Sequence, residues 1–457
     1  MKILNTIIIL SLLMVFSLVC KMDAAADTPK GNVRVVLENK VETASFKTVG
    51  NYELVDQSSG KPLLRLGKGE TWQVKIKSGM IEVHGPAKNY GPFNGPVMVR
   101  EAAVGNAIII NGRGERTYKS SIAGLNAING AGHEVSLNSV ANPSVLTAVG
   151  KMPLSGNGDL NLISYTGIVG SKRYRGSIEF RVESGSLTVV NELNIEDYLC
   201  GVVASEMPAS WPAEALKTQA VAARNYALQR VESTRGSSFN VTCDQSSQVY
   251  GGYDAESPAT NKAVEDTRGI VMLSGGNLVA AFFHSSSGGF TENSEDIWQE
   301  KLPYLRWKAD PFDKNDAYYN WQVNYTAEQL KDKLTGAGYK FGRVTDLQEL
   351  ARTSSGARVK KIAVKGEGPA GEPLTVEIYN ADNIRIALGL KSALFTFVKK
   401  YDKNKKLTGV SFTGSGWGHG LGISQYGVRG MASAGYNYQD ILKYYYTGAI
   451  LAKDYGR

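Results

Sequence analysis

Apolar and polar residues alternate in short runs over the first part of the chain. Residues 33–37 and 72–76 are examples, and glycine-containing turns separate the runs. Alternation with a period of two places apolar side chains on one face of a strand. We therefore expect a small β module over residues 30–88. A second β-rich stretch follows up to about residue 190, and its Asn-, Ser- and Gly-rich part near residues 120–156 predicts an insertion.

The pattern changes after residue 191. Proline in a first turn and Ser210 as the cap predict a long helix over residues 213–231. Further helices are expected over residues 327–334, 423–434 and 438–446, the last capped by Asn437. Strands and helices do not alternate regularly, so the fold class is α+β, with a β-rich N-terminal region and a mixed α+β domain over residues 89–457.

The first 26 residues have the pattern of an export signal. Lys2 is followed by an apolar run over residues 7–19, and three alanines at 24–26 offer a cleavage site. The run is too short to span a bilayer, and no later run is long enough. We expect a secreted, extracytoplasmic protein without a membrane span after cleavage. Cys20 could instead be lipidated, although the bulky Val19 precedes it.

The 457 residues have a formal net charge of +8, which favours residence near anionic wall polymers. The basic residues are scattered, so we expect no nucleic-acid partner. No metalloprotease, zinc-ribbon, phosphate-loop or dinucleotide motif is present in the sequence.

Glu206 is the acid that the sequence singles out. It closes an apolar segment and precedes a proline and a helix that bears Lys217 and Arg224. Desolvation at such a position raises the pKa of a carboxyl, as a general acid requires. Lys217 and Arg224 are seven residues apart on one helix face, where they could hold a substrate. The alternative is that all three form caps, ion pairs or a solvated face.

Two glycine-rich clusters add candidate residues. Residues 283–289 end an apolar strand with His284 and three serines, and residues 416–420 combine Trp417 and His419 with three glycines. Trp417 could stack on a sugar ring and His419 could donate a hydrogen bond to it. The alternative is a tight backbone crossing with a buried, hydrogen-bonded histidine.

Cys200 and Cys243 remain after signal cleavage. They could form one disulfide in an oxidising compartment, or pack as small buried residues.

Four ordered motifs resemble stage II sporulation protein D and the related amidase enhancer proteins. They are residues 198–208 with 214–224, residues 248–252, residues 284–289 and residues 416–427. The resemblance covers the chain from about residue 174 to its C-terminus. It implies a peptidoglycan lytic transglycosylase in which the glutamate of the Glu-Met-Pro motif, Glu206, is the catalytic acid and base.

The resemblance also implies a set of substrate-binding residues: Lys217, Gln219, Arg224, Gln248, Tyr250, His284, Ser287, Trp417, His419, Ser424 and Gln425. Tyr250 and Gln425 could alternatively pack the motifs together. Some similar proteins carry a His-Cys pair where this chain has Ser246 and Ser247, and certain members bind zinc near the catalytic glutamate. A zinc site here would have to recruit Cys243 and His284 with Cys200 or water. We expect no cofactor, and a bridge between Cys200 and Cys243 in preference to a metal.

Two other functions remain open at this point. One is a non-catalytic protein that stimulates a separate wall amidase, as the name amidase enhancer suggests. The other is a wall-anchoring module formed by the N-terminal β region, which truncation before about residue 91 would test.

Overall fold

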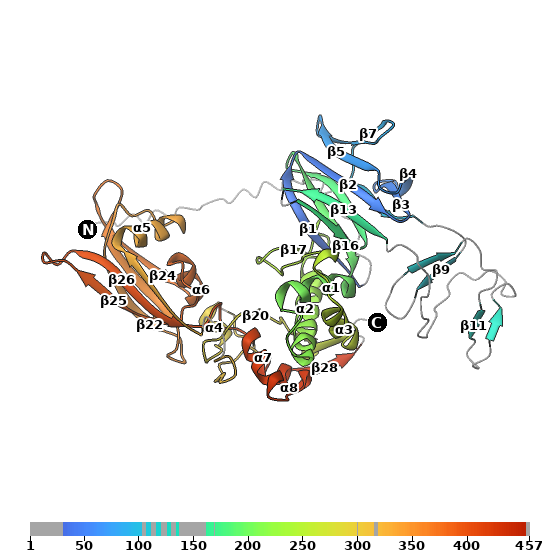
Figure 1. Ribbon diagram of the computed structural model, residues 1–457. Coiled ribbons are helices and arrows are strands. Elements are labelled where there is room, and N and C mark those ends of the chain that lie inside the picture. Colours follow the sequence, from blue (N-terminus) through green and yellow to red (C-terminus); the bar gives the residue numbers. More distant parts are fainter. Residues whose placement is uncertain are drawn as a thin grey trace, which may run out of the picture.

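A computed structural model describes residues 31–102, 107–110, 116–119, 126–128, 134–136, 161–168, 170–298, 300–314 and 319–453. Figure 1 shows an elongated molecule with a β-sandwich, a helical body and a β-rich lobe formed by residues 319–415. The α+β class with a β-rich N-terminal region is confirmed. The expected signal peptide, with Cys20, lies outside the described residues.

Two sheets pack face to face in the sandwich because their strands bury alternate residues. In β2 (Thr43–Val49), Ala44, Phe46 and Thr48 are buried while their neighbours are not. Phe46 stacks on Phe180 of the opposite sheet, with ring centroids 5.5 Å apart. One sheet has the order β17 (Val241–Thr242), β1 (Asn32–Val41), β16 (Ser186–Asn194), β15 (Ser177–Glu183), β8 (Val97–Glu101), β3 (Tyr52–Asp56), β4 (Lys61–Leu66). The other has the order β14 (Gly170–Tyr174), β13 (Leu162–Gly167), β2, β5 (Thr71–Lys77), β6 (Met80–His84), β7 (Asn89–Phe93).

Strands from both sides of residue 88 share these two sheets. β1 pairs with β16, and β3 pairs with β8. The boundary expected at residue 88 therefore falls inside one sandwich. Of the insertion expected near residues 120–156, the structure describes β11 (Asn126–Ile128) and β12 (Glu134–Ser136), and the rest lies outside the described residues. A hairpin of β9 (Ala107–Ile110) and β10 (Arg116–Lys119) precedes it.

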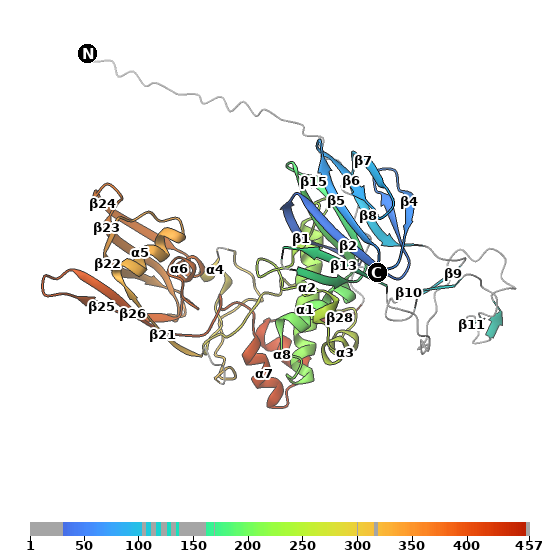
Figure 2. The same ribbon diagram turned by 45° about the horizontal axis from the view of Figure 1, so that its top comes forward.

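The helical body follows the sandwich without a break, because α1 (Ile195–Glu206) begins directly after β16. The long helix expected after Ser210 is α2 (Ala213–Ser233), which packs against four other helices of the body (Figure 2). The expected cap is wrong: Pro212 occupies the N-cap position, and no side chain caps the helix. The remaining helices are η2 (Tyr253–Ala255), α3 (Pro258–Asp266), α4 (Ser294–Ile297), α7 (Gln425–Ser433) and α8 (Tyr438–Tyr445). The short strands of the helical body are β18 (Ile270–Ser274), β19 (Asn277–Leu278), β20 (Phe283–His284), β27 (Ile423–Ser424) and β28 (Ile450–Lys453).

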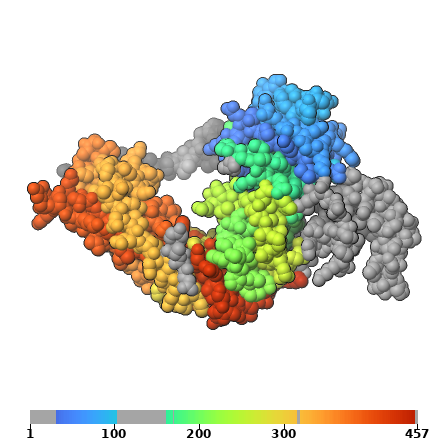
Figure 3. Space-filling model, viewed as in Figure 1, coloured from blue at the N-terminus to red at the C-terminus, as the bar shows by residue number. Residues whose placement is uncertain are grey.

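The lobe of residues 319–415 has a hydrophobic core of its own, which includes Trp321, Leu347 and Phe412. Its helix expected over residues 327–334 is confirmed as α5 (Ala327–Gly336), with a capping box at Thr326 and Gln329. The other elements are β21 (Asn320–Thr326), β22 (Arg343–Arg352), β23 (Val359–Glu367), β24 (Pro373–Tyr379), α6 (Ala381–Ala387), β25 (Phe395–Tyr401) and β26 (Leu407–Ser415). Figure 3 shows the surface hollowed between this lobe and the helical body.

Within the described residues, no helix has both the length and the apolar character needed to cross a membrane.

Candidate active site

Glu206 is the last residue of α1, at the point where two hydrophobic cores meet. Val203 belongs to the core shared with the sandwich, and Met207 belongs to the core of the helical body. Met207 is extended, with φ −133° and ψ 139°. The proline that follows excludes Met207 from the helical conformation on steric grounds. The chain therefore leaves the helix directly after Glu206 and holds its side chain half-buried between the cores.

The surroundings of Glu206 favour the protonated carboxyl. Burial raises its pKa above the ordinary value, and hydrogen bonds from Val249 and Gln425 oppose this shift only in part. The N–H of Val249 donates to Oε1 at 2.9 Å. In the part of the chain that the structure describes, no cationic side chain lowers this pKa. A carboxyl in these surroundings can donate a proton at a higher pH than an exposed glutamate can.

Helix α7 brings a second motif to Glu206. β27 runs parallel to β20 and pairs His284 with Ser424, which then caps α7 by accepting a hydrogen bond from the N–H of Gly427 at 3.2 Å. Gln425, the first residue of α7, donates from its side-chain amide to the main-chain carbonyl of Glu206 at 3.3 Å. The Glu-Met-Pro motif and the C-terminal motif therefore meet in the structure.

A buried aspartate that the sequence analysis missed connects α7 to residues 285–289, the serine loop. Oδ2 of Asp313 accepts hydrogen bonds from the hydroxyls of Ser286 and Ser287 and from the N–H of Gly288, each at 2.9 Å. The hydroxyl of Ser424 lies 3.5 Å from the same oxygen. Ser287 and Ser424 are thus held by this aspartate. No motif surrounds Asp313 in the sequence, and a pair of acids three residues apart is the one local signal that could have pointed to it.

A second buried acid, Asp310, lies beside the first turn of α7. Its Oδ2 accepts a hydrogen bond from the hydroxyl of Tyr445 at 3.0 Å, and a Cβ added at Gly427 would lie 2.6 Å from it. Burial, and then the charge of Asp313, raise the pKa of Asp310 to about 6. A side chain at position 427 would therefore clash with the Asp310 carboxyl, and glycine lets the carboxyl pack against the helix.

His284 and His419 lie together in an aromatic cluster. Their ring centroids are 5.2 Å apart, and His419 is equally close to Trp298. Nδ1 of His419 accepts from the N–H of Leu421 at 3.0 Å, so its proton lies on Nε2, which donates to the carbonyl of Phe283 at 3.1 Å. Burial lowers the pKa of His419 to about 4 and that of His284 well below its ordinary value. The structure thus favours the packing interpretation of His419 over a hydrogen bond to substrate.

Trp417 differs from these histidines because 40% of it is exposed. Its backbone forms a two-way bridge with Ser286, and the ammonium of Lys391 lies 4.5 Å from its ring centroid. The indole therefore stands next to the serine loop, where it can contact a ligand.

Two of the three residues expected on α2 are engaged in ion pairs. The buried Arg224 binds both carboxylate oxygens of Glu196, at 2.9 and 2.7 Å, and Lys217 pairs with Glu214 at 2.9 Å. Gln219 is fully buried, and neither end of its amide has a hydrogen-bond partner among the described residues. Its amide is thus a buried polar group that a substrate cannot reach in this structure.

Gln248 and Tyr250 connect parts of the first core. The hydroxyl of Tyr198 donates to Gln248 at 3.1 Å, and Tyr250 donates to Asn191 at 2.9 Å. Both residues are almost fully buried. Their loop reaches Glu206 through the backbone of Val249, so the expected packing role of Tyr250 fits the geometry.

The expected disulfide is wrong, because Cys200 and Cys243 are both free thiols. The thiol of Cys243 points to the carbonyl of Leu37 at 3.5 Å. Burial raises the pKa of Cys200 to about 12. Each thiol packs as a small apolar group against the first core.

The ligands considered for zinc do not gather. The two cysteines lie against the first core, while Nδ1 of His284 is hydrogen-bonded to the carbonyl of Leu421 at 3.2 Å. Among the described residues, no group of three or more His, Cys, Asp and Glu side chains forms a possible metal site.

Comparison with known proteins finds two family matches. Residues 183–273 match the family described as stage II sporulation protein, and residues 304–422 match a domain of unknown function. The first match contains Glu206, and the second contains the whole lobe of residues 319–415.

Individual relatives extend the likeness. The chain is 32% identical over 281 residues to stage II sporulation protein D of Bacillus subtilis, covering 58% of this chain and 76% of the relative. It is 30% identical over 281 residues to stage II sporulation protein D of Bacillus amyloliquefaciens, again covering 58% of this chain and 76% of the relative. It is also 34% identical over 296 residues to the amidase enhancer of Bacillus subtilis, covering 55% of this chain but 40% of that longer protein. With these matches, and with Glu206 held at the meeting point of its motifs, the chain belongs to the stage II sporulation protein D family.

Proposed function

We propose that the chain is a lytic transglycosylase that cuts the glycan strands of peptidoglycan, with Glu206 as both acid and base. Family membership supports a cell-wall-related role. One observation carries the chemistry: Glu206 is a half-buried carboxyl whose pKa is raised by burial, and no cationic side chain of the described residues offsets that shift.

The reaction needs one carboxyl in two protonation states. Neutral Glu206 gives its proton to the glycosidic oxygen, the bond from that oxygen to C1 of the muramic sugar breaks, and positive charge develops at C1. The carboxylate left behind then takes the proton of the C6 hydroxyl of the same sugar. O6 bonds to C1, which closes a 1,6-anhydro ring and leaves Glu206 protonated again.

The surrounding residues suit this chemistry. The nucleophile belongs to the substrate, so neither a second carboxylate nor a cofactor is invoked. The exposed ring of Trp417 offers a flat apolar surface to a sugar. The substrate lies outside the cytoplasm, which agrees with the export signal expected over residues 1–26.

Product analysis tests the proposal. Purified protein is incubated with peptidoglycan or with glycan strands stripped of peptides, and 1,6-anhydro-muramic ends are measured by mass spectrometry. We expect these ends from wild type and from Glu265→Gln, a control on the surface of α3 where Glu265 pairs with Arg268. Glu206→Gln should produce at least about 100-fold less, since general acid–base catalysis contributes that much or more. Equal product from wild type and Glu206→Gln, or none from wild type, would refute the proposal.

A second candidate function rests on the likeness to the amidase enhancer. In this alternative the chain stimulates a separate cell-wall amidase and cuts nothing itself. An amidase assay with added wild type or Glu206→Gln separates the two functions. A non-catalytic enhancer would stimulate equally with either protein, whereas an enhancer that works by cutting glycan would lose its effect in the variant.

A further inference from the structure

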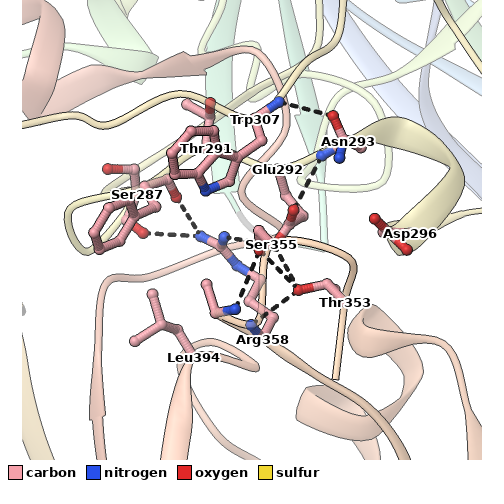
Figure 4. A network of polar contacts seen from close by, with 12 residues as sticks. Ser287, Thr291, Glu292, Asn293, Asp296, Trp307, Thr353, Ser355, Arg358 and Leu394 are labelled. Carbon is pink, nitrogen blue, oxygen red and sulfur yellow. Dashed lines mark hydrogen bonds and ion pairs between the residues drawn. The ribbon is translucent and has the colours of Figure 1, made fainter. Parts of the chain in front are cut away.

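Arg358 is a fully buried arginine from the lobe of residues 319–415 that reaches into the helical body. It directly precedes β23. Its Nη2 donates to the carbonyls of Ser287 at 2.8 Å and Phe290 at 2.9 Å, as Figure 4 shows for Ser287. One nitrogen thus binds both ends of the turn of residues 287–290, which begins in the serine loop.

The second glycine-rich motif makes room for this guanidinium. A Cβ added at Gly420 would lie 2.5 Å from Cζ and Nη2 of Arg358, so any larger residue would displace the arginine. The carbonyl of Gly420 in turn accepts the N–H of Glu292 at 2.9 Å. Arg358 therefore lies between the two loops that hold the serines and Trp417.

The charge of Arg358 is balanced by Glu292, which is also fully buried. Nη1 of Arg358 is 3.7 Å from Oε2 of Glu292. The same oxygen accepts hydrogen bonds from the hydroxyls of Thr353 at 2.8 Å and Ser355 at 2.7 Å, both on the lobe (Figure 4). A buried charge persists only when it is paired and hydrogen-bonded in this way. The network therefore joins the lobe to the helical body at a defined geometry.

A short chain of hydrogen bonds leads from this network to Glu206. Arg358 binds the carbonyl of Ser287, and the N–H of Ser287 donates to the hydroxyl of Ser424 at 3.1 Å. Ser424 caps α7, whose first residue, Gln425, donates to the carbonyl of Glu206. A movement of the turn at Ser287 would consequently shift the cap of the helix that touches the catalytic residue.

We infer that Arg358 is a positioning residue, through which the lobe of residues 319–415 fixes the serine loop and α7 and thereby the place of Glu206. The inference rests on the proposed glycan cleavage. Arg358 itself is buried and meets no substrate. Its positive charge also contributes, after burial and His419, to lowering the pKa of His284, which lies at the start of the same loop.

Four variants separate positioning from general stability. Arg358→Met removes the hydrogen bonds, and Arg358→Lys keeps a charge that can reach one carbonyl. The control is Arg352→Met, because Arg352 lies on β22 of the same lobe and, among the described residues, its hydrogen bonds stay within that lobe, to Glu349, Ala357 and Phe395. The double variant Arg358→Met with Glu292→Gln removes the carboxylate that would otherwise stay buried and unpaired.

Steady-state cleavage of glycan strands is the first measurement. We expect kcat of Arg358→Met and of the double variant to fall by about 10- to 100-fold with KM within about twofold, since small misplacements of a catalytic group have effects of this size. Arg358→Lys should recover part of kcat, and Arg352→Met should match wild type. A folded double variant with wild-type kcat, or an equal loss in Arg352→Met, would overturn the inference.

Hydrogen–deuterium exchange of the same proteins gives a readout that does not depend on cleavage. Faster exchange over residues 285–290 and 424–428 is expected in Arg358→Met and in the double variant and not in Arg352→Met. If wild type makes no anhydro ends, the proposed function fails, and the exchange result still decides whether Arg358 orders the loop. Unchanged exchange in a folded double variant would overturn the positioning role.

Discussion

At the scale of single residues, the burial of Glu206 couples its chemistry to the stability of the fold. A pKa raised in the folded state means that the folded chain holds this proton more tightly than the unfolded chain does. The stability gained from protonation is complete below the unfolded pKa of about 4.3 and is lost as pH rises through the folded pKa. Wild type should therefore lose stability relative to Glu206→Gln between mildly acidic and neutral pH. Thermal melts over a pH series, with Glu265→Gln as the control, measure this difference, and parallel curves for all three proteins would contradict it.

Asp310 should show the same sign of dependence. Its pKa is raised to about 6, so its ionisation should cost on the order of 3 kcal/mol of stability between about pH 4 and pH 6. Asp310→Asn can still accept from Phe312 and donate to Tyr445, and its stability should be flatter with pH than that of wild type. Urea unfolding at several pH values tests this.

Glu295→Gln is a control of opposite sign for that series. Arg306 lowers the pKa of Glu295 to about 2, so the stability that this group gives wild type builds up as pH rises from about 2 to the unfolded pKa of about 4.3 and stays constant above it. Because Glu295 is partly exposed, the effect should be small. If Asp310→Asn showed the same pH slope as wild type, the buried carboxyl would not be the group that titrates.

The sequence predicts which residues are buried candidates better than it predicts which residues they contact. Burial of Glu206 follows from its apolar segment, whereas the pairing of Arg224 with Glu196 joins residues 28 positions apart and could not be read from local spacing. The hydrogen bond from His419 to Phe283 spans 136 positions. Asp313 was missed for the same reason, because each of its donors comes from a distant loop.

At the scale of elements, the cap of α7 is the contact that sets Gln425 against Glu206. Ser424→Ala removes this cap and leaves the buried N–H of Ser287 unpaired, which together should cost on the order of 2 to 4 kcal/mol. We expect cleavage per folded molecule to fall as well, because α7 loses its fixed start. Activity assays well below the melting temperature, combined with thermal melts, measure both effects.

Asn437→Ala is the matched control for that variant. Asn437 caps α8 by accepting from the N–H of Asp440 at 2.9 Å, so its loss should cost about 1 kcal/mol and leave cleavage unchanged. Equal losses of activity in the two cap variants would mean that α7 acts only through overall stability.

The same two helices show what an element's sequence determines. The expected start of α8 after Asn437 is confirmed, since a cap is a local interaction. The helix expected from residue 423 begins at Gln425 instead, because Ile423 and Ser424 form β27 against β20. Strand pairing across 140 residues of sequence overrides the local helical pattern.

At the scale of the whole molecule, the sandwich is continuous with the helix that carries Glu206. β1 lies between β16 and β17, and β16 runs directly into α1. The alternating pattern identified these strands, but it could not show which strands share a sheet, so the boundary expected at residue 88 fell inside the sandwich. The N-terminal strands are therefore part of the structure that supports the candidate active site.

Deleting residues 31–88 should consequently unfold more than an N-terminal module. The deletion removes β1 to β6. Among them, β2 is a sheet neighbour of β13 and β1 is a sheet neighbour of β16, so their loss exposes the core that contains Val203 of α1. We expect an aggregating protein without glycan cleavage, measured by circular dichroism, size-exclusion chromatography and product analysis. In the full chain, Arg34→Met removes one of the two ion pairs of the buried Glu179, which keeps Arg181, and it should lower stability by at most about 3 to 5 kcal/mol while the folded fraction still cleaves glycan. A soluble, cooperative deletion protein that cleaves glycan at the wild-type rate would instead show that the first strands are a separate module, which is the arrangement that wall anchoring by this region alone requires.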